Sequence, residues 1–372
     1  MNPLRVLILT PSALPAITGN AMTVERWRRG LMAKGCQVLV LETRDPALPE
    51  LAAAVASFRP DLAHVHHLFL SGGLLLTEPL AGLLAGTPVV ATPAGTDLNR
   101  DLQDPDKRET LRRICRRTQG IVVQNRYFSR LLTDLLPSLR DRISHVPKSL
   151  CRLGDSPCRL RERTGIGADA FVFFLPAGIR PVKGNLEALL ALEEVYRRRP
   201  HVRAVFAGPI LDAEYGARFV REMGRRSSFA RWLPAIAPQT MAAAYGEIDV
   251  VLNCSVSEGL ANTLLESIAA GKPVLAADIE GNRWPVRGDG RVGPCGLLYD
   301  PGDKNGFIDQ ALRLVDDVAL RADLAQAARE RAAALPSPEE ETDGLLAAYR
   351  RARNELPCSA NTHERRKFYP GD

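Results

Sequence analysis

The sequence lacks the cysteine patterns that mark metal sites and disulfide frameworks. Seven cysteines, an odd number, are scattered over 372 residues, and no two of them form a Cys-x-x-Cys pair. Paired cysteines are the usual sign of a zinc site or of a small secreted scaffold, so both classes are disfavoured. Separate cysteines suit a reducing compartment, and we therefore expect a cytoplasmic protein.

Long hydrophobic runs are also missing. The N-terminal apolar segment LRVLILT covers residues 4–10, which suits a first β-strand better than a signal peptide. The most apolar region, residues 72–95, is interrupted by Glu78, Pro79 and Pro88, so it is a poor candidate for a membrane span. We expect a soluble protein.

The excess of positive charge is small, because 49 Lys and Arg face 43 Asp and Glu. Arginines cluster at residues 112–117, 197–199 and 350–353. Solvated helix faces are the simpler interpretation, and peripheral contact with an anionic membrane surface is the alternative. No aromatic-rich module accompanies the clusters, so we do not expect a nucleic-acid partner.

Strand-like and helix-like segments alternate along both halves of the chain, which is typical of parallel α/β sheets. Ligands of such sheets bind beyond the carboxyl ends of the strands. We predict an α/β fold of two Rossmann-like parallel domains that face a central cleft. The predicted segments are an N-terminal domain over 1–165, a second domain over 166–335, a C-terminal helix over 336–356 and a disordered tail over 357–372.

Local patterns predict further elements. A helix is expected from about Thr23 to Lys34, and another single helix around 71–85. The polar, basic segment 151–166 is typical of a linker. The strand over 61–67 ends in histidines, and His66 alternates with Val65, so it points to a different face.

The segment SEGLANTLLESIAAGKPVLAA, residues 257–277, holds two glutamates eight positions apart, Glu258 and Glu266. It follows a strand-like run and contains a helical pattern. At a helix start, unpaired backbone amides and the helix dipole attract a phosphate. Glu266 would lie about 12 Å further along the helix. The amides concerned belong to Gly259, Leu260, Ala261 and Asn262. The alternative is that one glutamate favours the dipole and the other is solvated.

Three other groups follow strand-like runs. Gly19 and Asn20 lie in a loop where glycine permits close backbone approach. His66 ends a strand, where a lone histidine is more often structural. Arg180 and Lys183 follow the strand AFVFFLPAG, and two cations at that position suit a diphosphate, although a basic turn is the plainer interpretation.

Four motifs together resemble one known family. They are DLAHVH, AGIRPVKGNLEAL, SVSEGLANTLLESIAAGKPVLA and CGLLYDPGD. The chain is similar over residues 1–350 to family 4 glycosyltransferases of the GT-B fold. Within that family, TGNAMTVERW, GTDLNRD and EGN are similar to two subgroups, the glycosyltransferase 1 domain-containing proteins and the selenosugar synthases. The chain departs from the family at IEGNRWPVRGDG, where many members carry Gly-Gly-x-x-x-Glu, and at Thr18-Gly19-Asn20, where Gly-Gly is usual.

The resemblance implies roles for these residues. Arg180 and Lys183 would neutralise the donor diphosphate. Glu258 would bind hydroxyls of the transferred sugar, and Glu266 would bind the ribose. The amides of 259–262 would hold phosphate and sugar oxygens. His66 would lie near the sugar and the acceptor, and Gly19 and Asn20 at the edge where phosphate and acceptor meet.

The resemblance also implies a reaction, namely transfer of a hexose from a UDP- or GDP-type sugar with retention at the anomeric carbon. No GxGxxG follows the first strand, which disfavours an oxidoreductase. The Asp-Pro-Asp at 104–106 lies outside the expected cleft, so we predict no metal and no cofactor beyond the nucleotide sugar. Alternatives are a selenosugar synthase with selenophosphate as acceptor, a sugar-nucleotide epimerase, and a non-catalytic nucleotide-sugar-binding protein.

Overall fold

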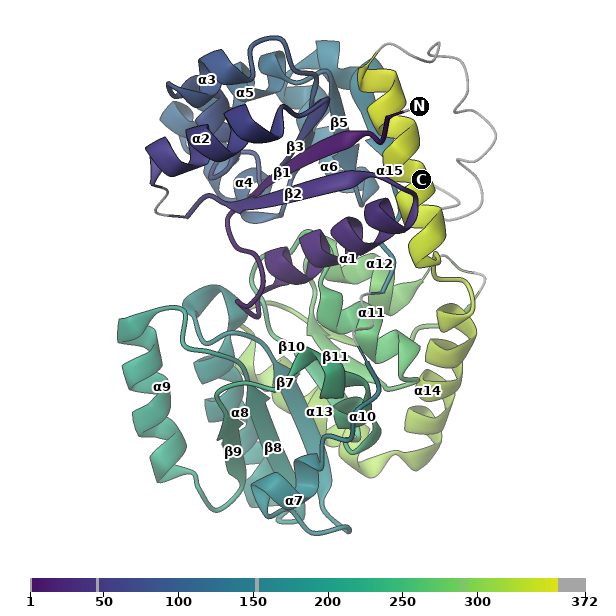
Figure 1. Cartoon of the computed structure of the whole chain (residues 1–372). Coiled ribbons are helices and arrows are strands. Elements are labelled where there is room, and N and C mark those ends of the chain that lie inside the picture. The colour runs from purple at the N-terminus through teal and green to yellow at the C-terminus, as the bar shows by residue number, and fades with distance from the viewer. Residues whose placement is uncertain (1, 45–46, 151–153, 289, 291, 354–372) are drawn as a thin grey trace. The chain divides into compact units, whose positions relative to one another are not determined.

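The computed structural model describes residues 2–44, 47–150, 154–288, 290 and 292–353. The predicted tail over 357–372 lies outside these residues. The chain divides into two compact units, each built on one sheet of six parallel strands (Figure 1). Unit 1 comprises residues 1–151 and 336–372, and unit 2 comprises residues 152–335. The predicted fold class of two Rossmann-like parallel α/β domains is confirmed.

The sheet of unit 1 has the strand order β2-β1-β3-β4-β5-β6. Alternate residues of its strands face two different apolar layers, because successive side chains of a strand point to opposite faces. Leu7 and Leu9 pack with the layer that contains α2 and α5, whereas Val6 and Ile8 pack with α1 and α15. Its strands are β1 (Arg5–Thr10), β2 (Gln37–Glu42), β3 (Leu62–His66), β4 (Val89–Thr92), β5 (Gly120–Val123) and β6 (Ile143–His145).

The helices of unit 1 include one from the C-terminal part of the chain. They are α1 (Gly19–Ala33), α2 (Leu48–Phe58), α3 (Leu80–Leu83), α4 (Thr96–Asn99), α5 (Pro105–Arg117), α6 (Arg126–Leu135) and α15 (Pro338–Ala352), with 3-10 segments η1 (Gly72–Leu76), η2 (Asp101–Gln103) and η3 (Pro137–Arg142). Figure 1 shows α15, in yellow, beside the strands of unit 1.

A buried ion pair fastens α15 to unit 1. Glu341 of α15 accepts hydrogen bonds from Arg26 Nε at 2.6 Å and Nη2 at 2.9 Å. Trp27 Nε1 donates to the same carboxylate at 2.8 Å, as does the amide of Ser149 at 3.0 Å. Burial alone would raise the pKa of Glu341, but the Arg26 guanidinium and the other donors hold that pKa below its usual value.

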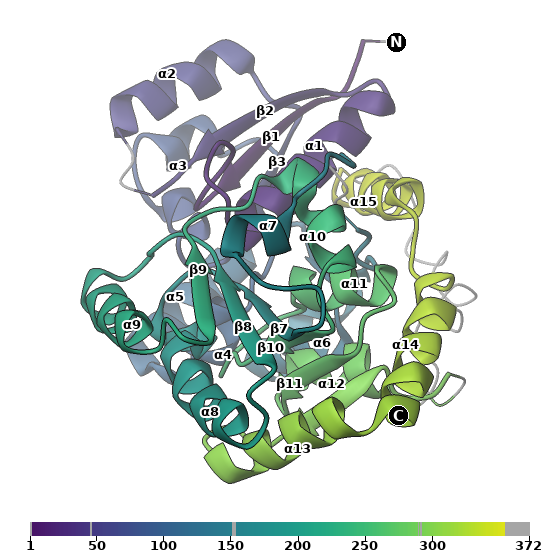
Figure 2. The same cartoon turned by 90° about the horizontal axis from the view of Figure 1, so that it is seen from below.

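The sheet of unit 2 has the order β12-β11-β10-β7-β8-β9. Its strands are β7 (Phe171–Pro176), β8 (Val202–Ala207), β9 (Ala230–Leu233), β10 (Val250–Asn253), β11 (Val274–Ala277) and β12 (Gly296–Tyr299). Figure 2 shows α8 and α13 on one side of this sheet and α10 on the other, and two separate apolar layers match these sides.

In unit 2 one short helix precedes the sheet, the following helices connect successive parallel strands, and the last two follow β12. They are α7 (Leu160–Thr164), α8 (Asn185–Arg198), α9 (Ala213–Arg225), α10 (Met241–Gly246), α11 (Asn262–Ala269), α12 (Glu280–Arg287), α13 (Lys304–Asp316) and α14 (Val318–Ala332), with 3-10 segments η4 (Pro181–Lys183) and η5 (Pro238–Thr240).

Three local predictions were wrong in detail. Helix α1 begins at Gly19 rather than near Thr23, because the Thr18 hydroxyl caps it by accepting a bond from the Ala21 amide at 3.1 Å. The single helix expected around 71–85 is split into η1 and α3, and Pro79, which cannot donate a backbone bond, lies between them. The expected linker over 151–166 contains the short helix α7.

Candidate functional site

Two of the predicted site segments lie against each other at the carboxyl edge of the sheet in unit 2. Arg180 and Lys183 follow β7, and Gly184 closes their turn with φ of 62°. A Cβ at Gly184 would lie 2.4 Å from the carbonyl oxygen of Cys254, which follows β10. Only glycine fits so close an approach in this left-handed conformation. Gly184 therefore allows the loop after β7 to contact the loop after β10.

Lys183 and Glu258 are in direct contact across these two loops. Lys183 Nζ donates to Glu258 Oε1, and Ser255 Oγ donates to the same oxygen at 2.7 Å. The two side chains are 20% and 13% exposed, so the pair is largely shielded but reachable from solvent. Burial would raise the pKa of Glu258, but Lys183, Ser255 and the nearby charge of Arg180 hold that pKa below its usual value. Glu258 is therefore an ionised carboxylate beside two cations.

Glu266 is held by a tyrosine that the sequence patterns did not indicate. It lies on α11, and the hydroxyl of Tyr245 on α10 donates to its Oε2 at 2.7 Å. Tyr245 carries no motif of its own and reads as an ordinary core residue, so no sequence signal could have found it. Ser255, by contrast, lies three residues before Glu258, inside the motif SVSEGLANTLLESIAAGKPVLA. The motif could therefore have indicated it as a site residue.

The start of α11 differs from its prediction. The helix begins at Asn262 with Ala261 in the capping position, and the Ala261 side chain has no group that could cap it. Gly259 and Leu260 thus precede the helix, in the loop between Glu258 and α11. The amides of the first helical turn face along the helix axis.

The departure at IEGNRW packs directly on the Glu258 loop. A Cβ at Gly281, in the first turn of α12, would lie 2.4 Å from the carbonyl oxygen of Glu258. Asn282 is fully buried, and its amide nitrogen donates to the Ala277 carbonyl at 3.0 Å. The glycine of this segment is therefore required by close backbone contact with the predicted sugar-binding loop.

The histidines of β3 are buried in unit 1 and neutral. His66 is 3% exposed, and its Nδ1 lies 3.5 Å from Thr10 Oγ1. Burial lowers the pKa of His66 well below its usual value, and the charges of Lys148 and Arg26 act in the same direction. His64 contacts Tyr349 and Thr92 at 2.7 and 2.8 Å, and burial lowers its pKa to about 3. His64 is thus a structural residue.

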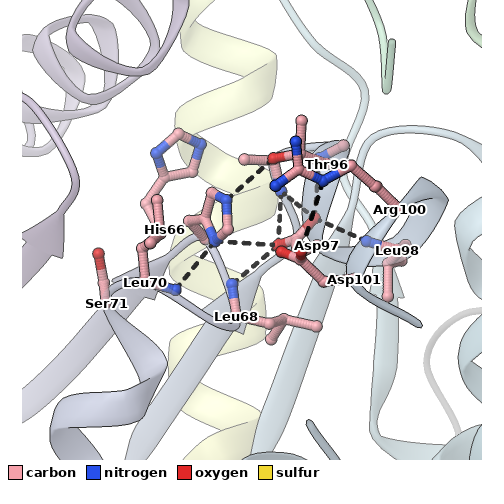
Figure 3. Close-up of polar contacts among 12 residues, drawn as sticks. His66, Leu68, Leu70, Ser71, Thr96, Asp97, Leu98, Arg100 and Asp101 are labelled. Atoms are coloured by element: carbon pink, nitrogen blue, oxygen red, sulfur yellow. Dashed lines mark hydrogen bonds and ion pairs between the residues drawn. The ribbon is translucent and has the colours of Figure 1, made fainter. Parts of the chain in front are cut away.

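Next to His66, a buried carboxylate joins the loops that follow β3 and β4. Asp97 is fully buried and accepts bonds from the amide of Leu68 at 2.8 Å and of Gly95 at 2.9 Å (Figure 3). His67 adopts φ of 78° and accepts a bond at Nδ1 from the Leu70 amide at 3.1 Å. Its other nitrogen, Nε2, therefore carries the hydrogen and donates to Thr96 Oγ1 at 3.0 Å.

Gly19 and Asn20 form the first turn of α1, directly after the loop that follows β1. Gly19 is exposed and Asn20 is half-buried. They belong to unit 1 with His66, whereas Arg180, Lys183, Glu258 and Glu266 belong to unit 2. In unit 2 the structure thus brings Lys183 into contact with Glu258, near the charge of Arg180, and places Glu266 separately against Tyr245. The other three residues lie at the carboxyl edge of the sheet in unit 1.

Comparison with known proteins identifies the chain. Residues 4–148 match the family described as glycosyl transferase 4-like domain, and residues 169–317 match glycosyl transferases group 1. The chain is a family 4 glycosyltransferase of the GT-B fold. The predicted family and the predicted enzyme class are confirmed.

Relatives of this glycosyltransferase carry several names. A D-inositol 3-phosphate glycosyltransferase of Acidothermus cellulolyticus is 29% identical over 320 residues, which are 81% of this chain and 69% of the relative. The glycosyltransferase 1 domain-containing protein 1 of Xenopus tropicalis is 21% identical over 323 residues, 84% of this chain and 89% of the relative. Both named groups thus cover most of the chain, and neither resemblance is close.

Solved structures agree on the fold. The Anabaena HepE structure with UDP and glucose superposes with a TM-score of 0.71 at 19% identity, covering 93% of this chain and 99% of its own. The sucrose-phosphate synthase of Thermosynechococcus elongatus gives a TM-score of 0.75 at 16% identity, covering 95% and 100%. Within the described part of the glycosyltransferase, no helix combines the length and apolar character that a membrane span requires.

Proposed function

We propose that this glycosyltransferase moves a hexose from a UDP-sugar to an acceptor, with retention at the anomeric carbon. The contact between Lys183 and Glu258 carries the proposal, because it joins the two signature loops at the edge where ligands of parallel sheets bind. Structures of HepE with UDP and with UDP-glucose support uridine as the base, as HepE has the same fold.

The reaction breaks the bond between the anomeric carbon and the diphosphate oxygen and forms a bond from that carbon to an acceptor oxygen or other nucleophilic atom. The acceptor proton passes to the leaving diphosphate, which therefore serves as the base. Negative charge grows on the diphosphate during this step. Arg180 and Lys183 stabilise it electrostatically, and Glu258 orients the sugar hydroxyls.

In this proposal the two glutamates contact different ends of the donor. Glu258, next to two cations, contacts the sugar end of the donor, and Glu266, held by Tyr245, contacts the ribose end. His66, Gly19 and Asn20 serve the acceptor and the phosphate edge. His66 is neutral, so in this proposal it acts as a hydrogen-bonding group rather than as a cation.

Thermal shift with a nucleotide panel tests donor binding. Ligands that bind only the folded state raise the melting temperature, so UDP and UDP-glucose should stabilise the wild type more than GDP or ADP. Glu266→Ala should lose most of this shift. Glu214→Ala, an exposed acid in the first turn of α9, is the matched control and should keep it. The absence of a shift with every nucleotide would contradict the proposal.

Turnover with an acceptor panel then separates the competing functions. D-Inositol 3-phosphate, hexose phosphates and selenophosphate are offered with UDP-sugars, and products are separated by chromatography. Conversion of the UDP-sugar without an acceptor would favour an epimerase, and binding without turnover would favour a non-catalytic protein.

We further propose that no metal is required, so activity should survive EDTA. Activity that EDTA abolishes and Mn²⁺ restores would overturn this point.

A further inference from the structure

Tyr245 is a buried residue that the proposed mechanism leaves without a role. Its side chain is 1% exposed, and its ring packs edge-on against Phe174 of β7, with ring centroids 5.8 Å apart. Its hydroxyl is its one polar side-chain group and donates to Glu266 Oε2 at 2.7 Å. The buried ring of Tyr245 thus holds its hydroxyl against one oxygen of Glu266, the carboxylate that is expected to bind the donor ribose.

The direction of this hydrogen bond is settled by chemistry. An ionised carboxylate can only accept, so the tyrosine hydroxyl must donate. Burial raises the pKa of Tyr245 well above its usual value, and the charge of Glu266 acts in the same direction. The hydroxyl therefore keeps its hydrogen throughout the working pH range and keeps pointing at Glu266.

The bond restricts how the Glu266 carboxylate can turn. A glutamate side chain has three rotatable bonds, and fixing them costs conformational entropy. Tyr245 is already fixed by the apolar layer of α10 and β7, so it can hold the carboxylate plane before a ligand arrives. A ribose presents two neighbouring hydroxyl donors, and a carboxylate of fixed orientation can accept from both.

We propose that Tyr245 is a positioning residue, which orients Glu266 toward the ribose hydroxyls and so makes the site select ribonucleotides over 2′-deoxyribonucleotides. This inference rests on the proposed function, since it assigns Glu266 to the ribose. A deoxyribonucleotide lacks one donor and leaves part of a fixed acceptor unpaired, which is how polar sites reject analogues that lack a hydroxyl. A carboxylate that can turn discriminates less.

A purely structural tyrosine would give a different pattern. Buried tyrosine hydroxyls usually find some partner, and Glu266 could be no more than that partner. Removal of the hydroxyl would then change stability but leave the preference for ribose over deoxyribose unaltered. The ratio of the two affinities is therefore the decisive quantity.

The test is calorimetric titration of UDP and 2′-deoxy-UDP into the full chain. The variants are Tyr245→Phe, Glu266→Ala and the double variant. Tyr196→Phe is the matched control, because the Tyr196 ring stacks on Phe229, with ring centroids 4.9 Å apart, elsewhere in unit 2. Melting temperatures of all variants are recorded, and Glu266→Asp is added because its shorter side chain keeps the charge but cannot keep the same contact with Tyr245.

Tyr245→Phe should weaken UDP binding about tenfold and bring the affinities for UDP and 2′-deoxy-UDP closer together. In the Glu266→Ala background the same change should have no further effect, because the two residues act as one unit. Glu266→Asp should reduce discrimination in the same way, and Tyr196→Phe should leave it unaltered.

Three outcomes overturn the inference. An unchanged ratio in Tyr245→Phe makes the tyrosine structural, even if Glu266→Ala weakens UDP as the proposed function requires. A full effect of Tyr245→Phe in the Glu266→Ala background shows that Tyr245 acts through another group. Absence of binding by UDP, GDP and ADP in the wild type removes the proposed function, and the inference with it.

Discussion

Both units contain a parallel sheet of six strands, but the carboxylates at the carboxyl edges of the two sheets differ in their partners and in their exposure. In unit 1, Asp97 is fully buried and saturated by backbone amides. In unit 2, Glu258 is held by Lys183 and Ser255 and stays 13% exposed. A carboxylate surrounded by amides of its own chain can only tie loops together. One that side chains hold and solvent still reaches can accept a ligand.

The histidines of the two units also differ in how far they are buried. Unit 1 buries His64 and His66 and half-buries His145, and desolvation lowers the pKa of each. The histidine described in unit 2, His201, is exposed. The pKa of these histidines of unit 1 is therefore lowered only in the folded chain, and unfolding makes them easier to protonate. The first two predictions change one buried or shielded ion pair in each unit.

The largest effect is expected for Glu341→Ala in unit 1. The substitution leaves Arg26 buried without its carboxylate, and breaking a buried pair in this way costs about 3–5 kcal/mol. Urea unfolding should show this loss of free energy of unfolding. Glu339→Ala, on the same helix but 73% exposed, is the control and should change little. A loss for Glu341→Ala no larger than that of the control would contradict the structure of this pair.

The next effect concerns activity and unit 2. Lys183→Met should lower kcat/KM about 10²–10³-fold, because one preorganised cation is removed from the position where negative charge develops. Lys304→Met, an exposed residue at the start of α13, should leave kcat/KM unaltered. If Lys183→Met changed the melting temperature but not kcat/KM, its contact with Glu258 would serve stability alone.

The sequence was sufficient for much of this comparison. Apolar runs marked the strands of both sheets, and apolar residues at helical spacing, such as Leu264 and Ile268, predicted a helix that the structure contains, with Asn262 as its first residue. Short-range patterns determine such features. Side chains that meet across the fold escaped prediction, since nothing local to α10 or to α15 shows that Tyr245 contacts Glu266 or that Glu341 contacts Arg26.

Acid should act on unit 1 before unit 2. The pKa of His64 is about 3 in the folded chain against an ordinary value of 6.5, so the unfolded chain binds more protons between these pH values. Stability is therefore lost as pH falls from 6.5 toward 3, by up to about 1.4 kcal/mol per pH unit for each such histidine.

Hydrogen exchange measured at pH 7, 6 and 5 should locate this loss. Peptides from β1 and β3 should lose protection more than peptides from β7 and β10. His64→Gln should flatten the dependence in unit 1, although the variant starts less stable. His201→Gln, the control in unit 2, should leave the dependence as in the wild type. Equal loss of protection in both units would refute the assignment to buried histidines.

The smallest effect comes from the cap that begins α15. Ser337 and Glu340 form a capping box, in which the Ser337 hydroxyl accepts from the Glu340 amide at 3.0 Å and the Glu340 carboxylate accepts from the Ser337 amide at 2.8 Å. Ser337→Ala should lower the free energy of unfolding of unit 1 by about 1 kcal/mol.

This loss should be smaller than that of Glu341→Ala, because the ion pair with Arg26 still fastens the helix after its first turn has frayed. Asp317, which caps α14 of unit 2 by accepting from the Leu320 amide at 2.8 Å, provides the matched substitution Asp317→Ala. Hydrogen exchange should assign the loss from Ser337→Ala to α15 and the loss from Asp317→Ala to α14. If Ser337→Ala cost as much as Glu341→Ala, docking of α15 would depend on its first turn rather than on the buried carboxylate.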